Sequence, residues 1–330
     1  MNDSIIRPAS ETMADRERLV TEAAHLLAAG RLVVLPTETV YGLAADATNH
    51  DAVAQIFAAK NRPQFNPLIA HVGDRAMAKA YGYFDRVAAV LADRFWPGPL
   101  TLVLPRRQEA HVSPGVTAGL PTIALRLPGD FFMHAVAARL GRPLAAPSAN
   151  RSGRVSPTTA QAAAEELGAH VAMIVDTGRC TVGVESTIVA VDDGKVRLLR
   201  PGGVSRAQIE AATGQPVELG ETDAQQPSAP GMLASHYAPE AIVRLEATSV
   251  APGDALLAFG AVPAAGQEQA RTVLNLSEKG DLAEAAANLF AHLRTLDASG
   301  ARTIAVMPIP ERGLGEAIND RLRRAAAPRG

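Results

Sequence analysis

The stretch Lys60-Asn-Arg-Pro-Gln-Phe-Asn-Pro-Leu-Ile-Ala-His71 places two cations directly before a proline-rich turn and a short apolar segment. Two cations that are two residues apart and are followed by proline cannot lie on one helical face. We therefore expect Lys60 and Arg62 at a helix end that runs into a rigid turn, with a strand at residues 68–72. Cations held in this way suit a phosphate ligand. A nucleotide-handling enzyme is the first hypothesis.

Alternating helix and strand patterns surround this stretch. Asn49 is a candidate N-cap for the helix that ends near Lys60. Strands are expected at residues 31–35, 68–72, 100–104, 122–127, 144–146 and 171–175, with a hairpin at 186–199 that turns at Asp192-Asp-Gly194. Helices are expected at residues 13–29, 85–95, 131–140, 159–167 and 205–212. Interleaved helices and strands predict an α/β fold, and the hairpin makes its sheet mixed.

The composition changes between residues 214 and 240, where periodic apolar residues become rare. A segment of this length is too long for a passive turn and predicts a linker. Beyond it, strands are expected at 242–245, 255–259, 272–276 and 303–307, and helices at 281–297 and 314–324. The 330 residues therefore divide into a first domain at 1–213, a linker or lid at 214–240, and a small α/β domain at 241–330.

The composition also limits the function. The formal net charge is −2, which counts against a dedicated nucleic-acid binder. The single cysteine, Cys180, excludes a disulfide framework and a thiolate-rich zinc site, and it fits a reducing compartment. No signal peptide and no apolar run long enough to cross a bilayer are recognisable. We expect a cytoplasmic protein without a membrane partner.

Polar side chains follow several of the predicted strands. Thr37 and Thr39 follow the strand at 31–35, and Pro147-Ser-Ala-Asn150 follows the strand at 144–146. His71 and Arg126 lie near the ends of two further strands. Because ligands of open α/β sheets bind beyond the carboxyl ends of strands, we expect these groups to meet in one crevice. Hydroxyls, an amide and cations there would suit a polyanion beside a small polar molecule.

Each of these residues also has a purely structural interpretation. The Pro36-Thr-Glu-Thr39 segment can be a strand exit with a local hydroxyl–backbone turn. Lys60 at a helix C-terminus is favourable to the helix dipole without any function. His71 can be a satisfied surface histidine, and Arg126 can be an edge residue whose charge reaches water. Only their combination in one chain favours a ligand site.

Five segments in this order, PTETVYGL, KNRPQFNPLIAH, WPGPLT, APSAN and GVEST, resemble the YrdC-like family. Arg200-Pro-Gly202, a linker with Pro230-Gly-Met232 and His236-Tyr-Ala-Pro239, and a small C-terminal domain are similar to the two-domain threonylcarbamoyl-AMP synthases of that family. The resemblance implies a twisted mixed sheet with a concave, cation-lined cavity, followed by a smaller Rossmann-like α/β domain.

The resemblance further implies a nucleotidyltransferase reaction. L-threonine, bicarbonate or CO2, and ATP would give threonylcarbamoyl-adenylate and pyrophosphate. A threonylcarbamoyl transferase machinery would then use this product to modify adenosine 37 of tRNA. No histidine or carboxylate cluster offers a protein cage for a metal, so Mg²⁺ would accompany ATP. We expect no tightly bound organic cofactor and no stable nucleic-acid binding.

The resemblance also assigns the site residues. Lys60 and Arg62 would act in catalysis by stabilising charge on the α-phosphoryl group and on departing pyrophosphate. ATP would contact Lys60, Arg62, Asn66, Thr122, Ser148, Asn150, Ser156, Arg200 and Tyr237. L-threonine would contact Thr39, His71, Arg126, the main chain at Ala146, and Ser186.

Four further expectations concern details of this site. We expect Lys60 at the rim of the cavity, and Tyr237, outside both domains, in a lid that closes over the nucleotide. Structural or supporting roles are expected for Glu38 and Glu185. Leu233-Ala-Ser235 stands where many relatives carry basic residues, so electrostatic help from the linker is in doubt.

Two other functions stay open at this point. A carbamoyl-transfer enzyme of the same superfamily would act on a different acceptor, but such enzymes append zinc-binding or larger catalytic modules. A non-catalytic RNA-binding module would bind tRNA tightly, with a steep dependence on salt. The single cysteine disfavours the first alternative and the near-neutral charge disfavours the second.

Overall fold

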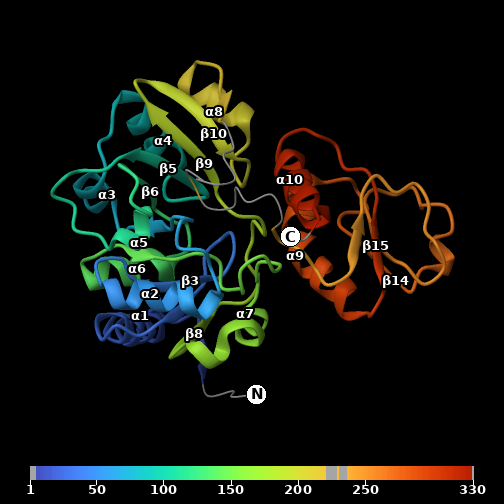
Figure 1. The fold of residues 1–330 in the computed structure, drawn as a ribbon, viewed down its shortest axis with the longest axis horizontal. Helices are drawn as coiled ribbons and strands as arrows, with labels where there is room; N and C mark the ends of the chain where they lie inside the picture. The colour runs from blue at the N-terminus through green and yellow to red at the C-terminus, as the bar shows by residue number, and fades with distance from the viewer. Residues whose placement is uncertain (1–4, 221–228, 230–235, 329–330) are drawn as a thin grey trace.

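The structure is a computed structural model that describes residues 5–220, 229 and 236–328. The described chain forms one sheet of 11 strands and a second sheet of 4 strands. Figure 1 shows the N-terminal part, coloured blue to yellow, beside the smaller C-terminal part in orange and red. The mixed α/β architecture with a large twisted sheet confirms the expected fold class.

The large sheet combines parallel and antiparallel pairs. Its order is β1 (Ile6–Pro8), β8 (Met173–Asp176), β2 (Val33–Leu35), β3 (Gly42–Asp46), β7 (Leu144–Ala145), β4 (Ile69–His71), β6 (Thr122–Arg126), β5 (Leu100–Pro105), β9 (Thr187–Asp192), β10 (Lys195–Arg200) and β11 (Glu218–Leu219). Strand β3 is antiparallel to both β2 and β7, and β7 is antiparallel to β4. Strands β4 and β6 are parallel, with His71 opposite Arg126.

Helices cover both faces of this sheet. They are α1 (Met13–Ala28), α2 (His50–Lys60), α3 (Arg75–Tyr81), α4 (Arg86–Phe95), α5 (Pro114–Thr117), α6 (Phe131–Leu140), α7 (Ala160–Leu167) and α8 (Arg206–Thr213). Val34 of β2 belongs to the core beneath α2, α4 and α7, whereas Val33 and Leu35 belong to the core beneath α1 and α6. This division follows from the alternation of side chains along a strand.

The end of α2 has the form that the sequence predicts. The Asn49 side chain caps its first turn by accepting a hydrogen bond from the backbone N–H of Ala52, 3.0 Å away. Asn61 takes a left-handed conformation with φ of 52° directly after Lys60, the last helical residue. Asparagine tolerates this conformation better than most residues do. Asn61 therefore turns the chain away from the helix axis between the two cations. The backbone carries Arg62 in a different direction from Lys60.

The sequence interpretation missed several short elements, of which β3 matters most for the site. Gly42–Asp46 is buried throughout and pairs with β2, so the segment at residues 36–41 connects two adjacent strands. Its Gly-Leu-Ala-Ala-Asp sequence lacks the β-branched and aromatic residues that indicate a strand. The elements β1, β11, α3 and α5 were missed as well, and each is seven residues or shorter.

The C-terminal part has its own sheet and core. All pairs in the order β12 (Ile242–Arg244), β15 (Thr303–Val306), β13 (Ala255–Ala258) and β14 (Thr272–Asn275) are parallel. Helices α9 (Leu282–Ala298) and α10 (Leu314–Ala326) lie on the side that faces the large part (Figure 1). Their core extends to Val40, Val155 and Val184 of the large part. The boundaries at 213 and 240 stay a prediction, and much of 214–240 lies outside the described residues.

Within the described ranges, none of the helices is long and apolar enough to cross a membrane. The same ranges contain no group of three or more His, Cys, Asp or Glu side chains that could hold a metal ion.

Candidate active site

A cavity with about 650 Å³ of space, including its open mouth, lies where the large sheet meets residues 236 and 237. Its lining comes from the β2–β3 connection, the end of α2, strands β4 and β6, the β7–α7 connection, and the adjoining ends of β9 and β10. The lining residues are Thr37, Thr39, Val40, Gly42, Lys60, Arg62, Ile69, His71, Arg126, Met133, Ala146, Pro147, Ser148, Asn150, Ser152, Glu185, Ser186, Arg200, His236 and Tyr237.

The cavity lies on the face of the sheet and not at one edge. The groups expected in one crevice do line one cavity, but they do not all follow the carboxyl ends of parallel strands, because β7 runs antiparallel to β4. The carboxyl end of β7 therefore meets the amino end of β4, where the backbone N–H of Ala146 donates to Ile69 O at 3.1 Å. Ile69 and His71 point to the same side of the sheet, and both line the cavity.

Positive charge dominates the cavity. Four cations line it, Lys60, Arg62, Arg126 and Arg200, and all four are buried. Glu185 is the one carboxylate among the described lining residues. Charges interact more strongly in a buried site than in water, so this excess favours a polyanionic ligand.

Lys60 is 1 % exposed and lies beneath the β7–α7 connection. Its Nζ donates to the carbonyl oxygen of Ser148 at 2.6 Å and to that of Asn150. Burial, together with the nearby Arg62 charge, holds the pKa of Lys60 well below its ordinary value. The expectation that Lys60 lies at the rim is therefore wrong: the helix end directs its side chain inward, where two main-chain carbonyls satisfy it.

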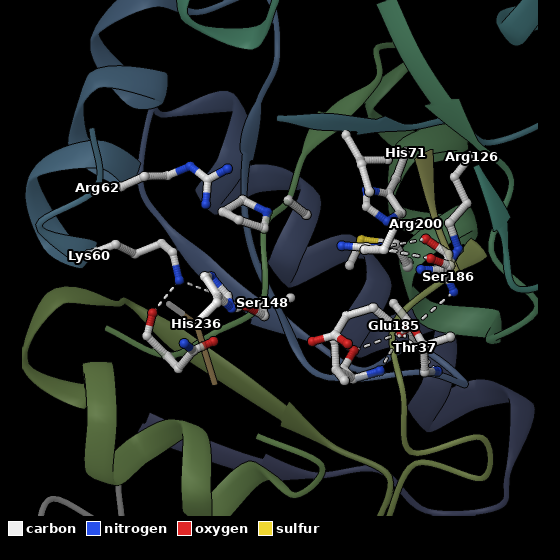
Figure 2. A pocket seen from close by; sticks show the side chains of 18 of the residues that line it. Thr37, Lys60, Arg62, His71, Arg126, Ser148, Glu185, Ser186, Arg200 and His236 are labelled. Atoms are coloured by element: carbon white, nitrogen blue, oxygen red, sulfur yellow. Dashed lines mark hydrogen bonds between the residues drawn. The ribbon is translucent and has the colours of Figure 1, made fainter. Parts of the chain in front are cut away.

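Arg62 lies at the same end of the cavity as Lys60 (Figure 2). Its Nε donates to Asn66 O at 3.3 Å and its Nη2 donates to Pro67 O at 2.9 Å. The proline-rich turn thus folds back and fixes the guanidinium. Burial lowers the pKa of Arg62 to about 10, so it remains a cation at neutral pH.

Arg126 lies at the other end, together with His71 and Ser186 (Figure 2). Its Nη2 is 2.9 Å from Glu38 Oε1 and donates to Thr39 Oγ1 at 3.0 Å, while its Nε donates to Gly98 O at 3.3 Å. Burial acts to raise the pKa of Glu38, but the Arg126 charge holds it below the ordinary value. Glu38 therefore orients Arg126, which agrees with the supporting role expected for this acid.

Arg200 and Ser186 form a second polar group near this end. Arg200 donates from Nη2 to Ser186 O at 2.8 Å and to Ser186 Oγ at 3.2 Å. The Ser186 hydroxyl also lies 2.7 Å from Thr101 Oγ1. Ser186 therefore presents a fixed hydroxyl to the cavity.

Most of the residues assigned from the sequence come together here. Eleven of the fourteen line the cavity, and the exceptions are Asn66, Thr122 and Ser156. Ser156 lies behind Glu185, to which its hydroxyl donates at 2.6 Å. Asn66 is fully buried, and its side-chain amide has no hydrogen-bond partner among the described residues. Thr122 lies at the start of β6, about 13 Å from Arg126 at the end of that strand. The roles of these three residues stay predictions.

Tyr237 is not outside both domains. It is 1 % exposed and belongs to the C-terminal core, where its ring stacks on Phe290 of α9 with 5.5 Å between centroids. It also lines the cavity, so its closing over a nucleotide stays a prediction. Residues 230–235, which include Pro230-Gly-Met232 and Leu233-Ala-Ser235, lie outside the described residues.

The sequence interpretation missed other lining residues. Gly42 and Ser152 lie within or beside the quoted segments, so those segments were the available signal. Met133 is a core residue of α6 that nothing in the sequence separates from its apolar neighbours. Cys180 lies outside the cavity, and burial raises the pKa of its thiol.

We predict that His71 destabilises the protein in acid. Burial and the adjacent Arg126 charge lower the pKa of His71 to about 3 from an ordinary value near 6.5. Between these values the unfolded chain binds the proton and the folded chain does not, so stability falls as the pH drops from about 6.5 toward 3. The variant His71→Asn should have a shallower acid limb in a plot of unfolding free energy against pH, measured by urea titration.

His170→Asn is the matched control for this experiment, because His170 is exposed. Burial lowers the pKa of His236 in the same direction, so the variant retains part of the acid limb. Equal slopes for His71→Asn and the unaltered protein would contradict the prediction.

Comparison with known proteins agrees with the fold and the site. A family model described as telomere recombination, named for Sua5, YciO and YrdC, matches residues 25–202. A second model, described as threonylcarbamoyl-AMP synthase C-terminal domain, matches residues 204–327. The chain is 39 % identical to the threonylcarbamoyl-AMP synthase of Bacillus subtilis, covering 97 % of this chain and 96 % of the relative.

A solved structure is similar over nearly the whole chain. It is the crystal structure of Pyrococcus abyssi Sua5 complexed with L-threonine, with a TM-score of 0.87 and 35 % identity. The match covers 98 % of this chain and 97 % of that one. The threonylcarbamoyl-AMP synthase of the same organism is 38 % identical over 94 % of this chain and 96 % of its own length. The chain therefore belongs to the two-domain threonylcarbamoyl-AMP synthases of the Sua5/YrdC family.

Proposed function

We propose that the chain is an L-threonylcarbamoyladenylate synthase, which makes this product from L-threonine, bicarbonate or CO2, and ATP with release of pyrophosphate. The observation that supports this proposal most strongly is a single cavity with cations at both ends. Lys60 and Arg62 lie at one end and Arg126 lies at the other. This arrangement suits a triphosphate and an amino-acid carboxylate side by side. The names of the relatives support the same reaction.

Threonine binds at the Arg126 end in this proposal. Arg126 can donate to the carboxylate from its Nη1, which makes no hydrogen bond with the described residues. His71 is too weak a base to accept a proton near neutral pH, because burial lowers its pKa to about 3. Its Nδ1 has no hydrogen-bond partner among the described residues, so it serves as a neutral hydrogen-bonding group for the amino acid.

Two steps complete the reaction. The unprotonated amine of threonine attacks bicarbonate or CO2 and gives a carbamate, with loss of water or of a proton respectively. A carbamate oxygen then attacks the α-phosphorus of ATP, and pyrophosphate leaves. Arg62 faces the charge that develops on the phosphoryl oxygens, and Lys60 supplies a further positive charge from beneath the β7–α7 connection.

We propose that Mg²⁺ would enter the site as a companion of ATP. Both oxygens of Glu185 already accept hydrogen bonds, from Ser156 Oγ and Arg321 Nε, so it is not free to bind a metal. We propose that phosphate oxygens and water hold Mg²⁺. The adenylate would pass to a transferase machinery that modifies adenosine 37 of tRNA, without stable nucleic-acid binding by this chain.

The proposal predicts pyrophosphate release that requires L-threonine. With ATP, Mg²⁺ and bicarbonate present, adding L-threonine should raise the rate of pyrophosphate release at least about tenfold, because the carbamate is the nucleophile. A coupled pyrophosphate assay measures this, with L-serine as the specificity control. A rate that stays the same without threonine would contradict the proposed function. Binding of tRNA without nucleotide, tested in parallel, would instead indicate the RNA-binding alternative.

A further inference from the structure

Glu185 is the one carboxylate among the described residues that line a positively charged cavity. It is 6 % exposed and lines the same space as Lys60, Arg62 and Arg200. Burial acts to raise its pKa, but the charges of Arg321 and Arg200 hold the pKa of Glu185 below its ordinary value. The side chain is therefore an anion. An uncompensated carboxylate at this place would repel the phosphates of ATP.

The partner of Glu185 comes from the C-terminal part of the chain. Arg321 of α10 is completely buried, and its Nε donates to Glu185 Oε2 at 2.8 Å. The other oxygen, Oε1, accepts from Ser156 Oγ at 2.6 Å. Arg321 also donates from Nη1 to Asp320 Oδ2 at 2.6 Å. The Glu185 carboxylate is thereby neutralised and held in one orientation by groups from both parts of the protein.

The same arginine contacts Tyr237. Its guanidinium carbon lies 5.2 Å from the centroid of the Tyr237 ring, a cation–π distance. The same ring stacks on Phe290 of α9, with 5.5 Å between centroids. Two helices of the C-terminal part therefore fix an aromatic ring that lines the cavity.

We propose that Arg321 is a positioning residue through which the C-terminal domain completes the part of the cavity around Glu185 and Arg200 and so sets the affinity for ATP. It cancels the charge of Glu185, keeps Ser156 in place and orients Tyr237. The inference rests on the proposed function, because it concerns the affinity of that site for ATP. It assigns the C-terminal domain a direct role in nucleotide affinity, through a side chain that does not itself line the cavity.

The test compares the dissociation constants of MgATP, measured by calorimetry without threonine or bicarbonate. Arg321→Gln keeps a hydrogen-bond donor for Glu185 but removes the positive charge. We expect its Kd for MgATP to rise at least about tenfold. Glu185→Gln keeps an acceptor for Ser156 and should leave Kd unchanged or lower. In the double variant Glu185→Gln/Arg321→Gln, Kd should return to within about threefold of the original value.

Arg206→Gln is the matched control. Arg206 of α8 also forms an ion pair with α10, to Glu316, and does not line the cavity. A purely structural role of Arg321 predicts that both arginine variants lower the melting temperature and that neither changes Kd for MgATP. That result would overturn the proposal. A rise of Kd in Glu185→Gln would overturn it too, since it would make the carboxylate itself a requirement for binding, for example as a metal ligand.

Glu185→Gln keeps the proposal testable if Arg321→Gln does not fold, because Arg321 still pairs with Asp320 in that variant. Calorimetry needs no turnover. A protein that binds MgATP but releases no pyrophosphate with threonine would therefore fail the proposed function while leaving this inference open to its own test.

Discussion

Lys60→Ala should lower the rate of threonine-dependent pyrophosphate release by at least about 100-fold. The Lys60 Nζ joins the carbonyl oxygens of Ser148 and Asn150, and it is one of four cations around the cavity. Removing one fixed electrostatic group from an active site costs about 100- to 1,000-fold in rate. The same variant leaves two buried carbonyls without a donor, each costing about 1–3 kcal/mol.

The burial of Lys60 changes what this variant does to the fold. Replacing a lysine at the rim would leave the melting temperature unchanged. Because Lys60 is only 1 % exposed, we expect Lys60→Ala to lower the melting temperature as well as the rate. The rate is therefore measured well below the melting temperature of the variant, with folding checked by circular dichroism. Lys79→Ala, on the exposed end of α3, is the control. A rate within threefold of the unaltered protein would remove Lys60 from the mechanism.

Arg126→Met should raise the KM for L-threonine at least about tenfold while leaving the Kd for MgATP within about threefold. A hydrogen bond to a charged group contributes about 1.5–3 kcal/mol, and 1.4 kcal/mol corresponds to a factor of ten in affinity. The two substrates respond differently because Arg126 and Arg62 lie at opposite ends of the cavity (Figure 2). Pyrophosphate release at varied threonine gives KM, and calorimetry gives Kd.

Loss of Arg126 also leaves Glu38 buried without its cation, so the single variant should be less stable. The double variant Glu38→Gln/Arg126→Met removes both charges and should recover much of the melting temperature. Its KM for threonine should stay high, because the carboxylate partner is still missing. Recovery of KM together with stability would show that Arg126 acts only through the fold.

Much of the fold follows from local patterns in the sequence. The helices α2, α4, α6 and α9 lie within one or two residues of the expected ranges, because capping residues and a 3.6-residue periodicity mark them. The left-handed conformation of Asn61 after Lys60 is also a local effect, because asparagine tolerates it better than most residues do. Strand β3 was missed because its small residues carry no strand signal, and its burial comes from its neighbours β2 and β7.

The site was only partly predictable for a different reason. The segments around Lys60, Arg126 and Ser148 were found as motifs, and eleven of the fourteen assigned residues line one cavity. They meet in one cavity as expected, but the direction of β7 was not predictable, since strand direction depends on long-range pairing. No local pattern indicates how deeply a lysine is buried. The prediction that Lys60 lies at the rim of the cavity was therefore wrong.

The sequence by itself determined the α/β class, most helices and strands, and the residue types that reach the site, because these depend on neighbours along the chain. Only the tertiary structure decided which strands run antiparallel, that Lys60 is buried against two carbonyls, and that Arg321 meets Glu185 across 136 residues. Those outcomes depend on groups that are far apart in sequence. The physical reason is that a buried charge is costly unless a polar or charged group compensates it. In the packed chain that group can come from any part of the sequence.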